Sequence, residues 1–361
     1  MKHFIKYLFV LLIGTSTLFG QEKTDSTEKS ISIFPLPVVY YTPETRLAYG
    51  AVALLTFRFE KEEDNRNSQI EIGAAHTQEN QLLFYIPYHI YTNQNKYYIF
   101  GELRYYRYSY NFYGIGNNIP SNIKETYKVN IPRIRINATK RYGKSTYVGF
   151  RYWFDNFNMG DVLEGGLLDL GGVPGSSGGI ISALGGVFLR DNRDNYNYPQ
   201  EGSYLEILAL PSLYSFGSEY EFSRISVDYV KYLSLSSKTV LAANGYWESN
   251  IGGVPFNEMA FIGGRSRMRG YYEGRYRDKN VLMGQVEFRQ TIKGRVGAVA
   301  FGGVAAVANN INDFQIEKRR YSGGLGLRYR LDQKDKVNIR LDYGFGAPGN
   351  SGLYLTFNEA F

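Results

Sequence analysis

The chain of 361 residues contains no cysteine, and only three histidines, His3, His76 and His89. The lack of cysteine excludes disulfides, thiolate nucleophiles and cysteine-ligated metals. Neither His76 nor His89 stands in a sequence context that suggests a Ser–His–carboxylate triad. The sequence therefore predicts no catalytic residues, no metal site and no cofactor, and we expect that the protein is not an enzyme.

Long apolar runs are also missing, apart from a short one at the N-terminus. Residues 1–20 have the pattern of a secretory signal peptide, in which Lys2 and Lys6 precede the apolar run Leu8–Ile13. A membrane anchor is the alternative, but this run is too short to cross about 30 Å of hydrocarbon. We expect Gln21 to be the first mature residue, although Leu18 is an imperfect residue for such a cleavage site. Residues 21–30 are expected to be disordered, and 31–361 to form one domain.

Blocks of like charge are absent too. The formal charge is +7, but the basic residues are spread along the chain. Such a distribution argues against a nucleic-acid-binding tail. We therefore predict no nucleic-acid partner.

Tyrosine (33) and glycine (40) are abundant, and apolar and polar residues alternate from about residue 31 to the end. In 280–290, Leu282, Val286 and Phe288 oppose Gln285, Glu287 and Arg289. In 335–346, Leu341 and Tyr343 oppose Arg340 and Asp342. A period of two indicates β-strands with two chemically different faces.

Alternation of this kind fits either a soluble β-sandwich or a transmembrane β-barrel. The polar face repeatedly carries full charges mixed with glycine, as a barrel lumen does, and tyrosines recur near the segment ends. We therefore predict an all-β, antiparallel transmembrane barrel in the bacterial outer membrane. About sixteen strands are expected, with twelve to fourteen as the alternative: 31–41, 47–58, 68–77, 81–91, 96–108, 127–139, 144–157, 179–190, 203–214, 219–233, 237–250, 280–291, 295–307, 320–331, 335–345 and 353–361.

The first strand is the weakest of these, because it contains Pro35 and Pro37, which lack backbone N–H donors. Proline is tolerated at a sheet edge, and the first strand is where a barrel closes. We predict a seam there, formed by Pro35 and Pro37 on one side and Leu353, Leu355 and Phe357 on the other. By strand parity, the long loops 109–126, 158–178 and 251–279 are extracellular and the short turns periplasmic.

A segment rich in arginine and glycine, 261–277, reads "FIGGRSRMRGYYEGRYR" and fits neither a core strand nor an ordinary helix. It is followed by "VLMGQVEFRQ" (281–290), "GGLGLRYRL" (323–331), "VNIRLDYGFG" (337–346) and "LYLTFNEAF" (353–361). Earlier segments, "YYTPETRLAYGA" (40–51), "FYGIGNN" (112–118) and "RDNRDNYNYPQEG" (190–202), add to the pattern. In order and spacing these motifs resemble the BamA/TamA superfamily of outer-membrane assembly and translocation barrels, in a short form without periplasmic repeat (POTRA) domains.

The resemblance implies that the arginine-rich loop is an extracellular lid that folds back into the lumen. Its motif would be Met268, Arg269, Gly270 and Tyr271. The guanidinium of Arg269 would bind a wall carboxylate through two aligned hydrogen bonds, with Glu287 as the expected partner. The second wall acid of the family falls near Gly302 or Gly303 in this chain, so either the lid is held by fewer contacts or Asp342 or Glu102 substitutes for it. A solvated surface patch is the alternative interpretation of these arginines.

The C-terminal segment places Leu353, Leu355, Phe357 and the final Phe361 on one face by alternation. This pattern resembles the insertion signal of exported barrels, with Phe361 as its last residue. Glu359 falls on the same face and is expected near the membrane interface, where a charge costs little.

Two functions remain open from the sequence. One is assistance with protein insertion or translocation at the outer membrane, through a weakly paired seam and a periplasmic or lipoprotein partner. The other is a gated passive pore with an arginine-rich lumen, in which the loop is a plug. Expected partners are outer-membrane lipids and lipopolysaccharide, the insertion machinery for the protein's own assembly, and, as a further option, a second copy of the chain.

Overall fold

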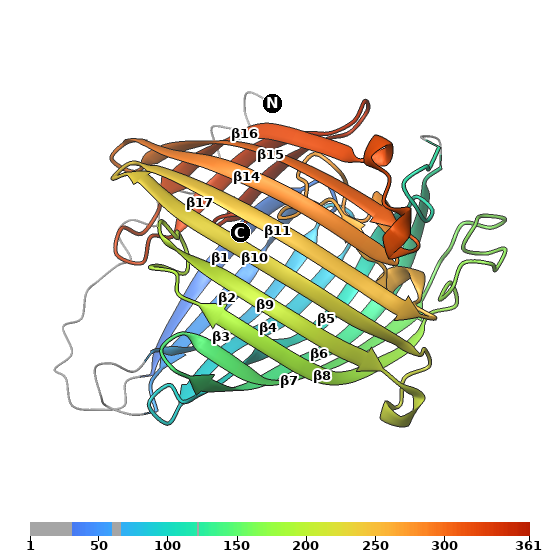
Figure 1. The fold of residues 1–361 in the computed structure, drawn as a ribbon, viewed down its shortest axis with the longest axis horizontal. Coiled ribbons are helices and arrows are strands. Elements are labelled where there is room, and N and C mark those ends of the chain that lie inside the picture. The colour runs from blue at the N-terminus through green and yellow to red at the C-terminus, as the bar shows by residue number, and fades with distance from the viewer. Residues whose placement is uncertain (1–30, 60–65, 121–122) are drawn as a thin grey trace. The chain divides into compact units, whose positions relative to one another are not determined.

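A computed structural model describes residues 31–59, 66–120 and 123–361. The predicted signal peptide (1–20) and the predicted disordered segment (21–30) lie outside these residues. Residues 31–361 include sixteen antiparallel strands that close into a barrel, as the alternation predicts (Figure 1). Each strand pairs with its neighbour in the chain, except that β11 pairs with β14 and β1 meets β18.

The strands have the following bounds: β1 Ser32–Thr42, β2 Arg46–Phe57, β3 Ser68–Thr77, β4 Leu82–Thr92, β5 Tyr97–Phe112, β6 Glu125–Tyr142, β7 Thr146–Met159, β8 Gly179–Asp191, β9 Gly202–Ser212, β10 Phe222–Ser236, β11 Thr239–Gly252, β12 Ala260–Ile262, β13 Tyr276–Asp278, β14 Asn280–Lys293, β15 Val296–Ala308, β16 Arg320–Arg330, β17 Asn338–Phe345 and β18 Ser351–Phe357. Four short 3₁₀ turns occur at Tyr214–Phe216, Phe256–Glu258, Ile311–Asp313 and Ile316–Lys318. Two strands, β12 and β13, form a separate small sheet inside the long loop. This small sheet could not be predicted from alternation, because each of its strands is only three residues long.

The outer face of the barrel is apolar. On β16, Leu325 is 69% exposed and Leu327 is 56% exposed, whereas Arg328 between two outward residues is buried. The same alternation places Leu282, Val286 and Phe288 of β14 outward. Because a soluble protein rarely exposes so continuous an apolar surface, this face fits hydrocarbon rather than water.

The connections divide between the two ends of the barrel. The end that carries 113–120, 123–124, 160–178, 253–279 and 309–319 is called the loop end. The opposite end, which carries most of the short hairpin turns, is called the turn end. At the turn end, residues 192–201 reach the β16–β17 turn, where Asn197 Nδ2 donates to the carbonyl of Asp335 at 2.9 Å. The predicted long loops therefore share one end of the barrel, as strand parity predicts, although the short β1–β2, β3–β4 and β17–β18 turns lie at that end too.

The barrel closes through a weak contact between its first and last strands. β1 and β2 pair in register along the whole of Ser32–Thr42. Between β1 and β18 there is a single registered pair, Tyr41 with Leu355. Pro35 and Pro37 lie in the part of β1 without a registered β18 partner, and a proline offers no N–H to a neighbouring strand. Hydrogen bonding at this seam is consequently confined to one end.

The last strand ends at Phe357, four residues before the position predicted for it. Asn358 has a φ of 58°, so the chain leaves the strand there. Glu359 then turns inward with a side chain that is 2% exposed, and Phe361 packs against the buried cluster of Val230, Tyr232 and Ala242. The prediction that Glu359 and Phe361 share the outer face of Leu353 and Phe357 is therefore wrong, because alternation holds only while the backbone stays extended.

Within the described part of the chain, no helix has the length and apolarity needed to cross a membrane. The same residues contain no group of three or more histidines or acids that could hold a metal ion.

Candidate functional site in the barrel lumen

The arginine loop, residues 253–279, folds back from the loop end against the inner wall. Its two ends are joined by pairing of β12 with β13. The residues between them pack into a buried apolar cluster with the wall strands, in which Met268 and Tyr271 are fully buried and Val281 and Met283 come from β14. Burial of this apolar surface is what holds a glycine-rich segment in one conformation.

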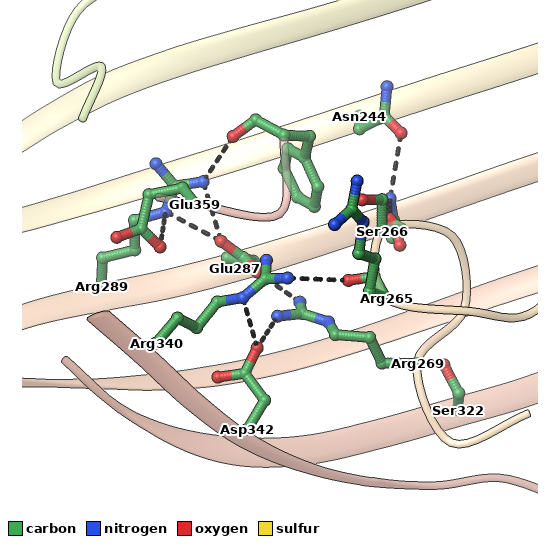
Figure 2. A network of polar contacts seen from close by, with 12 residues as sticks. Asn244, Arg265, Ser266, Arg269, Glu287, Arg289, Ser322, Arg340, Asp342 and Glu359 are labelled. Atoms are coloured by element: carbon green, nitrogen blue, oxygen red, sulfur yellow. Dashed lines mark hydrogen bonds and ion pairs between the residues drawn. The ribbon is translucent and has the colours of Figure 1, made fainter. Parts of the chain in front are cut away.

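Arg269 lies between two wall carboxylates (Figure 2). Its Nη2 contacts Glu287 of β14, and its Nη1 contacts Asp342 of β17. All three side chains are at most 1% exposed. The plane of the guanidinium also lies over the ring of Phe301, with 3.6 Å between Cζ and the ring centroid. The structure thus brings Arg269, Glu287 and Asp342 together, while Glu102 instead pairs with Arg104 and Arg135.

Further arginines extend this pair into a network. Arg289 Nε donates to Glu287 Oε2 at 2.8 Å, and Arg328 Nη1 donates to Asp342 Oδ1 at 2.5 Å. Arg340 Nε lies 3.5 Å from Asp342 Oδ2. A third carboxylate, Glu359, accepts from Arg328 Nε at 2.8 Å. The network therefore holds four guanidiniums, those of Arg269, Arg289, Arg328 and Arg340, against three carboxylates.

The balance of charge in this network matters because all of its members are buried. A buried ion is tolerated only when it is paired and hydrogen-bonded. The side chains carry one positive charge in excess, and Arg289 Nη2 also donates to the main-chain oxygen of Phe361 at 2.8 Å. Each carboxylate contacts at least two arginines, so the loss of a carboxylate leaves the remaining arginines with too few acidic side chains. The acids are thus the sensitive members of the network.

The backbone of Gly270 explains why glycine follows the arginine. Its φ is 108°, and a Cβ there would lie 2.6 Å from the carbonyl carbon of Phe345. A residue with a side chain would meet both the conformational and the steric penalty. Met268, two residues before Gly270, has a φ of 58°, which is unusual for a residue other than glycine, asparagine or aspartate. The loop is therefore held in this shape by its seat on the wall.

Tyr354, on the last strand, also forms hydrogen bonds with the loop. Its hydroxyl accepts from the N–H of Gly270 at 3.0 Å and donates to the carbonyl of Tyr271 at 3.3 Å. Tyr271 in turn donates to the carbonyl of Tyr321 at 2.7 Å and accepts from the N–H of Ala347 at 2.8 Å. The loop is thereby tied to β16, to β18 and to the turn before β18.

The departure from the family pattern at Gly303 has a steric counterpart. A Cβ at Gly303 would lie 2.8 Å from the sulfur of Met268. Met268 therefore fills the space beside Gly303, one of the two positions near which the resemblance implies a second acid, and Asp342 of β17 contacts Arg269 instead.

The other side of the seam contacts the loop through Glu44, in the turn between β1 and β2. The N–H of Glu273 donates to Glu44 Oε1 at 2.9 Å, and Gln81 Nε2 donates to the Glu44 carbonyl at 3.1 Å. Glu44 is 5% exposed. The arginine loop thus touches β18 through Tyr354 and the β1–β2 turn through Glu44, on both sides of the seam.

Burial, followed by the nearby carboxylate of Glu273, raises the pKa of Glu44 to about 7. A carboxyl whose pKa is higher in the folded than in the unfolded state contributes most to stability below its unfolded pKa of about 4.3. This contribution to stability is lost as the pH rises from about 4.3 to about 7, by about 1.4 kcal/mol for each pH unit in that range. We therefore expect the thermal unfolding midpoint of the membrane-embedded protein to fall between pH 5 and pH 8. Glu44→Gln should flatten this dependence, whereas Glu79→Gln, at an exposed glutamate of the neighbouring turn, should leave it intact. An equal pH response in Glu44→Gln would contradict the assignment.

Six members of the site were not singled out from the sequence as site residues: Glu44, Arg289, Arg328, Arg340, Tyr354 and Glu359. Alternation already places the three arginines on the inward face, and Tyr354 between two outward leucines. Their inward direction was therefore readable, but which loop residue each would meet was not. Glu359 had no such signal, because it follows the end of the strand.

Comparison with known proteins agrees with the barrel fold. The model of the Omp85 superfamily domain matches residues 65–359. BamA from Haemophilus ducreyi lacking POTRA domains 1–3 is similar in structure, with a TM-score of 0.61 and 14% identity over 92% of this chain and 70% of that one. For CdiB from Acinetobacter baumannii the TM-score is 0.58 and the identity 15%, over 92% of this chain and 60% of that one. For CdiB from Escherichia coli the TM-score is 0.55 and the identity 10%, over 92% of this chain and 68% of that one. No curated protein sequence matches significantly.

Proposed function

Because the chain belongs to the Omp85 superfamily, we propose that it assists the insertion or translocation of proteins at the bacterial outer membrane, without catalysing a chemical reaction. The loop end would face the outside and the turn end the periplasm. A periplasmic or lipoprotein partner would deliver client chains. Lipids, lipopolysaccharide and the insertion machinery would be its partners during its own assembly.

The seam carries this proposal. With one registered pair between β1 and β18, the edges of both strands retain backbone groups that are not engaged with each other. Such edges are templates for pairing with another strand. The apolar residues Ile33, Phe34 and Leu36 of β1 are well exposed beside it. A client strand could thus add to an edge while its apolar side chains enter the surrounding lipid.

A disulfide across the seam tests the proposal, and the cysteine-free chain makes the test clean. Oxidised Tyr41→Cys/Leu355→Cys protein in lipid vesicles should lose the ability to accelerate the insertion of a small unfolded outer-membrane barrel, and reductant should restore it. The matched control is Leu341→Cys/Leu355→Cys, which joins β17 to β18 at a registered pair and leaves the seam free. Full activity of the oxidised seam variant would refute the proposal.

A gated pore is the second candidate, and a lumenal cavity favours it. A cavity of about 310 Å³ is lined by Arg104, Arg135 and Arg151 together with Glu102 and Trp153. An arginine-rich constriction would favour anions over cations. In this case conductance should depend on displacement of the arginine loop, while the seam disulfide should have no effect on it.

A further inference from the structure

Four short hairpin turns at the turn end share a chemistry that the lumenal site does not use. They join β4 to β5, β6 to β7, β10 to β11 and β14 to β15, and their sequences, "NQNK", "YGKS", "SSK" and "KGR", contain no acidic residue. Each displays at least one exposed basic side chain. The turn-end collar is defined as these side chains and one neighbour on β6: Lys96, Lys140, Lys144, Lys238, Lys293 and Arg295.

The collar charges lack acidic partners among the described residues. None of the six side chains forms an ion pair with a described carboxylate, whereas Lys336 in the longer β16–β17 turn pairs with Asp194. Arg295 donates only to backbone carbonyls, including that of Leu331 at 2.7 Å. The segments 58–67, 192–201 and 331–337 contain acids in their sequences, and the collar is defined without them.

The collar lies where the apolar outer face ends. Lys96 Nζ lies 5.7 Å from the ring centroid of Tyr97, and Lys140 Nζ lies 5.5 Å from that of Tyr142. Lys293 follows Ile292, which is 55% exposed. Lysine and arginine next to exposed tyrosine and aliphatic residues are typical of the membrane interface, where the stem lies against hydrocarbon and the charge reaches the headgroups.

We propose that the turn-end collar binds the phosphate groups of anionic phospholipids in the leaflet that surrounds the turn end. Unpaired cations attract anionic headgroups at close range. The collar is also spread over hairpins from β4 to β15, with a longer turn between them. A soluble acidic protein would be expected to use one contiguous patch, whereas lipids surround a barrel on all sides. The inference does not depend on client transport.

The test compares lipid retention by three forms of the full-length protein. Each is purified in mild detergent from vesicles of phosphatidylcholine with phosphatidylglycerol, and the bound lipids are quantified by mass spectrometry. Wild type should be enriched in phosphatidylglycerol on the order of fivefold, the factor that one basic residue near an anionic leaflet contributes. Lys144→Gln/Lys238→Gln/Lys293→Gln, which removes three of the six collar charges, should lower this enrichment by at least about half.

The control variant removes three basic residues from the loop end, Lys124→Gln/Lys318→Gln/Arg319→Gln, and should retain the enrichment. Raising the salt to about 1 M, where the Debye length is about 3 Å, should abolish it in wild type. Because both leaflets of these vesicles carry the anionic lipid, the result is independent of the proposed topology. Unchanged enrichment in the collar variant, or an equal loss in both variants, would overturn the proposal and favour a soluble acidic partner. Heat-dependent gel migration establishes that every variant is folded.

Discussion

Replacing Arg269 by methionine is expected to lower the free energy of unfolding by about 3 kcal/mol, at the lower end of the range for breaking a buried ion pair. We expect a loss at the lower end of this range because of the charge balance of the network. Removing Arg269 leaves three arginines facing three carboxylates, so no buried charge lacks a counter-ion. What is lost is the pair of contacts from Arg269 to Glu287 and Asp342, and the packing of the guanidinium on Phe301.

Glu287→Gln should cost more than Arg269→Met, even though glutamine keeps the shape of the side chain. It leaves four arginines against two acidic side chains, so Arg269 keeps only Asp342, and Arg289 keeps only the more distant Glu359, as an acidic partner. The double variant should lose less free energy of unfolding than the sum of the losses in the two single variants, because both residues belong to one network. Urea unfolding in lipid vesicles, followed by tryptophan fluorescence, measures all three values.

The matched control for this series is Arg265→Met. Arg265 lies in the same loop and is exposed, and only its backbone carbonyl is engaged, by Arg340 at 3.1 Å. Its replacement should change the free energy of unfolding by no more than about 0.5 kcal/mol. Equal effects of Arg265→Met and Arg269→Met would show that the buried contacts of Arg269 contribute nothing to holding the loop.

The barrel could be predicted from the sequence because its chemistry repeats every second residue. Leu282, Val286 and Phe288 alternate with polar residues on β14, and the same rule applies to each wall strand, so the strand number and the inward set follow. The rule fails where the backbone is not extended. After Asn358 it misplaces Glu359 and Phe361.

Contacts between distant segments could be predicted only in part. Alternation points Glu287 and Asp342 inward, and an arginine near them is expected to pair with carboxylates. The contact of Arg269 with these two acids could therefore be predicted from the sequence. The contact of Tyr354 with Gly270 was not, because 84 positions separate the two residues and hydrogen bonding to a backbone N–H leaves no trace in the sequence of either segment. Glu44 was missed for the same reason, since its partner is the backbone of Glu273.

Gly344→Val is expected to expel the arginine loop from its seat. A Cβ at Gly344 would lie 2.7 Å from the carbonyl carbon of Arg269 and 2.8 Å from the nitrogen of Gly270. Both neighbours are backbone atoms that the surrounding hydrogen bonds hold in place, so a side chain cannot be accommodated by a rotamer change. Overpacking of this kind costs about 1–3 kcal/mol or more, and the least costly relief is movement of the loop away from β17.

The expected result is a barrel that still folds but conducts ions in planar bilayers at a level at least about tenfold above wild type, a change that corresponds to about 1.4 kcal/mol in the closed–open equilibrium. Gly284→Val is the control, because it makes the same change on β14 where a Cβ meets nothing within 4 Å. Conductance separates the two candidate functions when the same protein is tested for client insertion. If the protein is a pore, the conductance of Gly344→Val should rise whether or not the seam disulfide is present. If it is an insertase, the seam disulfide should block client insertion both in wild type and in Gly344→Val. If Gly344→Val conducts no better than Gly284→Val, the loop does not limit passage through the lumen.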